Sequence, residues 1–70
     1  MFIKFRDSKT FVYLHETNSD DLPIIPNNGD IVWLNGDNHK YKVKYKEFNV
    51  LGKNLLGKNE SVLMIYVKPI

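Results

Sequence analysis

The sequence predicts an all-β fold: a small barrel of five to six short strands in a single domain that spans residues 1–70. Its apolar residues come in short runs rich in Val, Ile, Tyr and Phe, and clusters of Gly, Asn, Asp and Pro separate these runs. Such runs are typical of strands joined by turns, and no stretch repeats its apolar residues with a helical period. A chain of 70 residues forms one domain at most, around a thin core.

Five segments carry the strand pattern. They are Phe2–Arg6, Thr10–Glu16, Asp30–Leu34, a long segment from His39 to about Val50, and Ser61–Lys68. Asn35-Gly36, between the third and fourth segments, is the strongest hairpin signal, because this dipeptide tolerates the positive φ of a tight turn. A loop with two prolines, residues 17–29, joins the second and third segments and is expected to cross over.

The fourth segment changes its pattern along its length. Its apolar residues occupy the odd positions Tyr41, Val43 and Tyr45, and then the even positions 48 and 50. A strand changes the face that it presents only where an extra residue is inserted, so a bulge is expected near Lys46–Glu47. Before the bulge, the three odd-numbered residues are expected to point into the core.

The last segment contains the run Val62–Val67, which is apolar at every position. Both faces of this strand are therefore expected to be buried. Because so small a barrel has few layers to cover the second face, the run predicts a homo-oligomer that forms through this strand.

The charge is small but unevenly distributed. The net charge is +2, yet residues 1–38 carry three basic and six acidic side chains, whereas residues 39–70 carry seven basic and two acidic ones. This asymmetry suggests complementary faces that meet a partner or another copy of the chain. The start "MFIKF" lacks the apolar core of a secretory signal, and no apolar run is long enough to span a bilayer. We expect a cytoplasmic protein without a membrane partner.

Four lysines alternate along the fourth segment: Lys40, Lys42, Lys44 and Lys46. Strand residues two apart lie about 6.7 Å from each other, so the lysines are expected to extend over roughly 20 Å of one face. Three interpretations remain open: a solvated face that protects an edge strand, a docking site for an acidic protein surface, or a track for the phosphates of a nucleic acid.

The sequence "LGKN" occurs twice, at residues 51–54 and 56–59, and adds Lys53 and Lys58. The stretch 52–59 nearly matches a phosphate-binding P-loop, but Asn59 replaces the Ser or Thr that binds magnesium and a strand pattern follows instead of a helix. We therefore interpret it as a turn region whose two lysines are exposed and extend a basic rim.

Trp33 is the only tryptophan, and it is a candidate binding residue together with Tyr45. With the other tyrosines these side chains are expected either to line an aromatic groove for a peptide or to pack in the core.

The sequence offers no catalytic site. The chain has no cysteine, which excludes thiol catalysis and cysteine-based metal sites. His15 and His39 lack the spacing of metal ligands, and no nucleophile has an evident base. We therefore expect no enzymatic activity, no cofactor and no bound metal.

Residues 25–50 carry a pattern found in small barrels. Its elements are Pro26, Gly29-Asp30, a strand, the Asn35-Gly36 turn, and Tyr41 with Val43 on the returning strand. In this pattern Gly29 permits the turn and Asp30 can accept hydrogen bonds from local backbone N–H groups. Short proteins of this type resemble Src-homology-3-like barrels, and many such short proteins are encoded by phages and mobile elements. The resemblance implies an SH3-like barrel and a phage-type origin, and it implies no catalytic residue.

The function expected from the sequence is binding, as a phage-type inhibitor or adaptor of a host or defence protein. The six lysines of residues 40–58 would meet an acidic surface, and aromatic residues near Trp33 would add buried contact. One alternative is a nucleic-acid binder that uses the lysines. Another is an oligomer that sequesters a small nucleotide through its two Gly-Lys-Asn turns.

Overall fold

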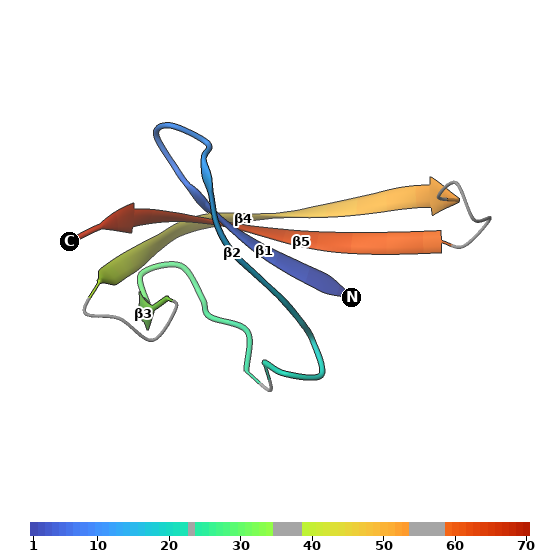
Figure 1. Cartoon of the computed structure of the whole chain (residues 1–70), viewed down its shortest axis with the longest axis horizontal. Coiled ribbons are helices and arrows are strands. Elements are labelled where there is room, and N and C mark those ends of the chain that lie inside the picture. The colour runs from blue at the N-terminus through green and yellow to red at the C-terminus, as the bar shows by residue number, and fades with distance from the viewer. Residues whose placement is uncertain (23, 35–38, 54–58) are drawn as a thin grey trace.

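In the computed structural model of the protein, five strands form a single sheet (Figure 1), and the described residues contain no helix. The structure describes residues 1–22, 24–34, 39–53 and 59–70, and for residues 50–53 and 59–60 it describes the backbone alone. The strands are β1 (Phe2–Asp7), β2 (Tyr13–Asn18), β3 (Ile31–Trp33), β4 (Lys40–Lys53) and β5 (Asn59–Pro69). The prediction of an all-β fold is confirmed.

The strands are arranged in the order β2-β1-β5-β4-β3. β1 and β5 run parallel, and every other neighbouring pair is antiparallel. The sheet curls into a half-barrel whose two edges are β2 and β3, and the β4–β5 hairpin extends beyond the other strands (Figure 1). The predicted hairpin of the third and fourth segments is confirmed by the β3–β4 pairing, although its turn, residues 35–38, lies outside the described residues.

The main core lies on the inner, concave side of the sheet. Its buried side chains are Ile3, Phe5, Leu34, Val43, Leu63, Ile65 and Val67. Half-buried residues of β2, of the loop that follows it, of β3 and of β4 complete this core: Leu14, Leu22, Ile25, Val32 and Tyr41. The loop between β2 and β3 therefore packs over the concave side of the sheet. The two edge strands, β2 and β3, contact the same core.

β5 also buries its outer face, as its sequence predicts. Val62, Met64 and Tyr66 form a second cluster and are 6–8% exposed. The chain covers this cluster with its own side chains, since the Tyr45 ring stacks on Tyr66 at 4.4 Å between centroids and the Phe11 ring meets the same ring edge-on at 6.0 Å. Self-association through β5 stays a prediction. It was expected because the outer face of β5 would need a cover, and side chains of the same chain already bury that face.

The bulge expected in the fourth segment is present, but two residues earlier than predicted. Val43 pairs with Val67 and Tyr45 with Tyr66, so Lys44 is the inserted residue. Val43 is buried in the main core, whereas Tyr45 lies on the outer face against Tyr66. The prediction that Tyr45 points into the core with Tyr41 and Val43 is therefore wrong, because the face changes before Tyr45 and not after it.

The second strand begins at Tyr13, three residues later than the predicted start at Thr10. The intervening residues form the β1–β2 turn, in which Phe11 adopts a positive φ of 62°. The Asp7 carboxylate accepts hydrogen bonds from the backbone N–H groups of Lys9 and Thr10 at 2.8 and 2.9 Å. These bonds stabilise the ionised carboxylate and lower the pKa of Asp7.

Candidate functional site

The bulge divides the four alternating lysines between two faces. Lys40 and Lys42 lie on the outer face, opposite Trp33 and Ile31, and are exposed. Lys44 is the inserted residue and is also exposed. Lys46 pairs with Ile65 of the main core, so its side chain leaves β4 on the inner face. The prediction of four lysines along one face is therefore wrong.

The last three predicted lysines have separate outcomes. Lys46 is half-buried, and its Nζ donates a hydrogen bond to the Asn27 side-chain oxygen at 3.3 Å. This bond ties β4 to the loop before β3. Lys53 ends β4, with only its backbone described, and Lys58 lies outside the described residues, as does half of the two Gly-Lys-Asn sequences.

A lysine that the sequence pattern did not single out joins Lys40 and Lys42. Lys68 of β5 pairs directly with Lys42 of β4, and both side chains are exposed. The strand register thus places five exposed side chains on one outer corner of the sheet. We call them the basic patch: Ile31, Trp33, Lys40, Lys42 and Lys68.

Trp33 is the largest side chain of the basic patch. Its side chain is 54% exposed and does not belong to the core. The alternative in which Trp33 packs in the core is therefore wrong. The Lys40 Nζ lies 5.1 Å from its ring centroid, a distance at which a cation is attracted to the aromatic face. Ile31, 49% exposed, adds an aliphatic surface beside it. Exposed aromatic residues are enriched at protein interfaces, so Trp33 makes this corner a candidate binding surface.

A tight turn positions β3 and hence half of the basic patch. Gly29 adopts a φ of 92°, and the Asn27 backbone N–H donates to the Asp30 carboxylate at 2.8 Å. The Asp30 carbonyl oxygen then accepts from the Val43 N–H at 2.9 Å, which fixes the start of β3 against β4. The roles predicted for Gly29 and Asp30 are confirmed.

Tyr45 lies on the same outer face as Trp33 but outside the basic patch. It is 37% exposed and stacks on Tyr66, whose hydroxyl donates to the Glu47 carboxylate at 3.5 Å. Burial raises the pKa of Tyr45, and Tyr66 and Glu47 raise it further. Among the described residues, no ring contact joins Trp33 to a tyrosine, so the predicted single aromatic groove is not formed.

A groove lies between the two edges of the half-barrel, next to the basic patch. Its volume is about 330 Å³. Its apolar lining comes from β1, the loop after β2 and the region of β3, and consists of Phe5, Leu22, Pro26, Val32, Trp33 and Leu34. His15, Thr17 and Asp21 form a polar side. Trp33 therefore borders both the groove and the basic patch.

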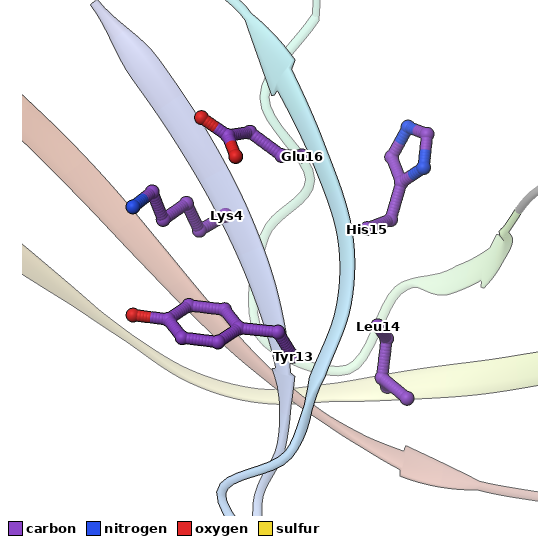
Figure 2. Close-up of a pocket in the computed structure, with 5 residues that line it drawn as sticks. All are labelled: Lys4, Tyr13, Leu14, His15 and Glu16. Carbon is purple, nitrogen blue, oxygen red and sulfur yellow. The ribbon is translucent and has the colours of Figure 1, made fainter.

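A second hollow, along β2, does not gather its side chains around one point. It has a volume of about 260 Å³ and is lined by Lys4, Tyr13, Leu14, His15 and Glu16. Figure 2 shows Lys4, Tyr13 and Glu16 on one side of the strand, and Leu14 and His15 on the other. Because these groups diverge, they do not form a site for a single ligand.

The described residues contain no group of three or more acidic or histidine side chains that could hold a metal ion. Nor does this part of the chain include a helix that could cross a membrane. Comparisons with protein-family models, with curated proteins and with solved structures give no match. The candidate site is therefore defined by geometry alone: the basic patch and the groove beside it.

Proposed function

We propose that the protein is a non-catalytic binding module, built as a small barrel of the SH3-like type, that docks an acidic surface of another protein on its basic patch. An inhibitor or an adaptor would act through such a surface. The proposal draws on the charge, the exposed aromatic residue and the position of the patch at one corner of the sheet.

The observation that carries the proposal is the direct pairing of Lys42 with Lys68. Like charges directly opposite each other on neighbouring strands destabilise a sheet. Among the residues that the structure describes, neither lysine has an ion-pair partner, so the repulsion is not relieved inside the chain. An anionic group placed between the two ammonium groups would relieve it.

The shape of the basic patch favours a protein over a nucleic acid. The bulge at Lys44 and the inward direction of Lys46 interrupt the row of lysines that would follow a phosphate backbone. Trp33 is the only aromatic residue of the patch, whereas proteins that bind single strands stack successive bases on several rings. Ile31 and Trp33 instead give an apolar centre with a charged border, which is the usual composition of a protein interface.

The test is affinity capture from a lysate of the source organism with three immobilised proteins: wild type, Lys42→Glu and Lys9→Glu. Lys9 is an exposed lysine of the β1–β2 turn, so Lys9→Glu has the same change in charge outside the basic patch. We expect a protein that is retained by wild type and Lys9→Glu and lost with Lys42→Glu. The recombinant partner should bind Lys42→Glu about tenfold more weakly than wild type.

A partner that binds Lys42→Glu as tightly as wild type contradicts the proposal. So does an eluate that holds nucleic acid in place of protein, recognised by absorbance near 260 nm that nuclease removes and by affinity that falls steeply with salt.

A further inference from the structure

Among the described residues, the edge strand β3 has backbone groups next to the basic patch that no neighbouring strand pairs with. In an antiparallel pair, the N–H and C=O of one residue point to the same side and those of the next residue point to the other. Because the Asp30 carbonyl oxygen accepts a hydrogen bond from Val43, the N–H of Ile31 points away from β4. The N–H and C=O of Ile31, and the N–H of Trp33, therefore lie on the second edge of β3, where the sheet ends.

The same alternation separates the side chains of β3. Ile31 and Trp33 lie on the outer face with Lys42 and Lys40, whereas Val32 packs against the main core and lines the groove. A strand added to the second edge of β3 would follow this alternation. Every second side chain would lie beside the basic patch, and the intervening ones would enter the groove of about 330 Å³.

We propose that the partner supplies an extended acidic segment that adds a strand to the open edge of β3. Alternate carboxylates of this segment contact Lys40 and Lys42 across Ile31 and Trp33, and the apolar side chains between them fill the groove above Val32 and Leu22. Backbone hydrogen bonds to Ile31 and Trp33 supply affinity, and the alternating side chains supply specificity. This inference rests on the proposed function and names the form of the partner.

Charge favours an acidic segment over a second copy of the chain at the open edge of β3. A second copy of the chain, paired through its own β3, would bring two basic patches together and add repulsion between lysines. An acidic segment instead brings the opposite charge close to Lys40 and Lys42. The groove, with a volume near the lower limit for ligand pockets, accommodates one or two apolar side chains and not a folded element.

The experiment is a selection of random peptides, displayed in a library, on the immobilised protein. We expect the enriched peptides to carry acidic residues at alternating positions with apolar residues between them. The best of them is then synthesised and titrated against wild type, and amide hydrogen exchange is measured with and without it. We expect exchange at Ile31 and Trp33 to slow when the peptide binds, because their N–H groups become hydrogen-bonded.

Two matched variants separate backbone pairing from side-chain contact. Ile31→Ala keeps the outward N–H, and Ile31→Pro removes it without breaking a hydrogen bond to β4. We expect Ile31→Pro to weaken peptide binding about tenfold more than Ile31→Ala. If Ile31→Pro does not fold, a synthetic chain with an ester in place of the amide between Asp30 and Ile31 removes the same N–H and keeps the side chain.

The outcomes distinguish this inference from the function on which it rests. Binding that is lost with Lys42→Glu but equal in Ile31→Pro and Ile31→Ala overturns the added strand and leaves the acidic partner in place. Binding that is insensitive to Lys42→Glu overturns both. A selection that enriches no acidic alternating peptide also overturns the inference.

Discussion

Lys42 and Lys68 lie directly opposite each other on neighbouring antiparallel strands, with both side chains exposed on the outer face. On its other side, Lys42 pairs with Ile31 of β3. The two charges therefore lie next to an apolar side chain. A sheet that had only to fold would gain stability from an opposite charge at either position. Under the proposed function, stability and binding therefore have opposite requirements at this pair, and the two can be measured separately.

Replacing Lys42 with glutamate is expected to stabilise the folded protein. The change turns a repulsive cross-strand pair into an attractive one with Lys68, which contributes about 0.2–1 kcal/mol to the free energy of unfolding. Urea denaturation at low salt measures the gain. Lys42→Gln, which removes the repulsion without adding attraction, should fall between wild type and Lys42→Glu. A gain that does not shrink at high salt would show that the effect is not electrostatic.

Trp33→Ala is expected to weaken partner binding and to leave the fold intact. The ring is 54% exposed, so the fold loses mainly its contact with Lys40, worth about 0.5–1 kcal/mol. The loss in binding should be larger, about 2 kcal/mol, because exposed tryptophans are often central to interfaces. Thermal unfolding and titration with the captured partner measure the two effects. Ile24→Ala is the matched control, since Ile24 is a 78% exposed apolar residue outside the basic patch; equal losses in binding for both variants would count against the role of Trp33.

Gly29→Ala is expected to destabilise the turn that begins β3. An added Cβ meets no atom within 4 Å, so the effect comes only from the backbone, whose φ of 92° is unfavourable for alanine. We expect a loss of about 1–2 kcal/mol in the free energy of unfolding, measured by chemical denaturation. Gly29→Asn should lose less, because asparagine tolerates positive φ better than alanine. If alanine and glycine are equally stable here, the turn does not require the left-handed conformation.

The stability of the protein is expected to fall at alkaline pH partly because of Tyr45. Its pKa in the folded protein is raised above the ordinary value of 10.0 by burial, by Tyr66 and by Glu47. The unfolded chain therefore loses this proton first as the pH rises, which favours unfolding above pH 10 and has no effect below it. Tyr45→Phe removes the titrating group, so urea denaturation at pH 7 and above pH 10 should show a smaller alkaline loss than in wild type. An equal loss in both proteins contradicts the assignment to Tyr45.

Much of the fold could be predicted because strands and turns leave local signals. The apolar runs, the Gly29-Asp30 turn and the apolar β5 all correspond to observed features. The bulge was predicted two residues too late, because the alternation counted Tyr45 as a core residue. An aromatic ring is equally suited to the core and to a stack on the outer face, and only its neighbour across the sheet, Tyr66, decides between them.

The candidate site was harder to predict because its members come from three strands. Lys40 and Lys42 formed a visible pattern, but Lys68 is separated from them by the whole β4–β5 hairpin. The register between β4 and β5 brings it opposite Lys42, and a register is not encoded in the spacing of lysines. The sequence does contain one indication of the position of Lys68. Lys68 follows Val67 at the end of the apolar run, and strand alternation places it on the outer face.

The parallel pairing of β1 with β5 has a consequence for the synthesis of the chain. The ribosome completes the β1–β2 hairpin first, yet β1 finds its central neighbour only after β5 has left the exit tunnel. Until then Ile3 and Phe5, which the finished protein buries, have little to pack against, and one edge of β1 is open to other chains. We therefore expect the nascent hairpin to expose these apolar side chains until β5 is synthesised, and the half-barrel to close only after that.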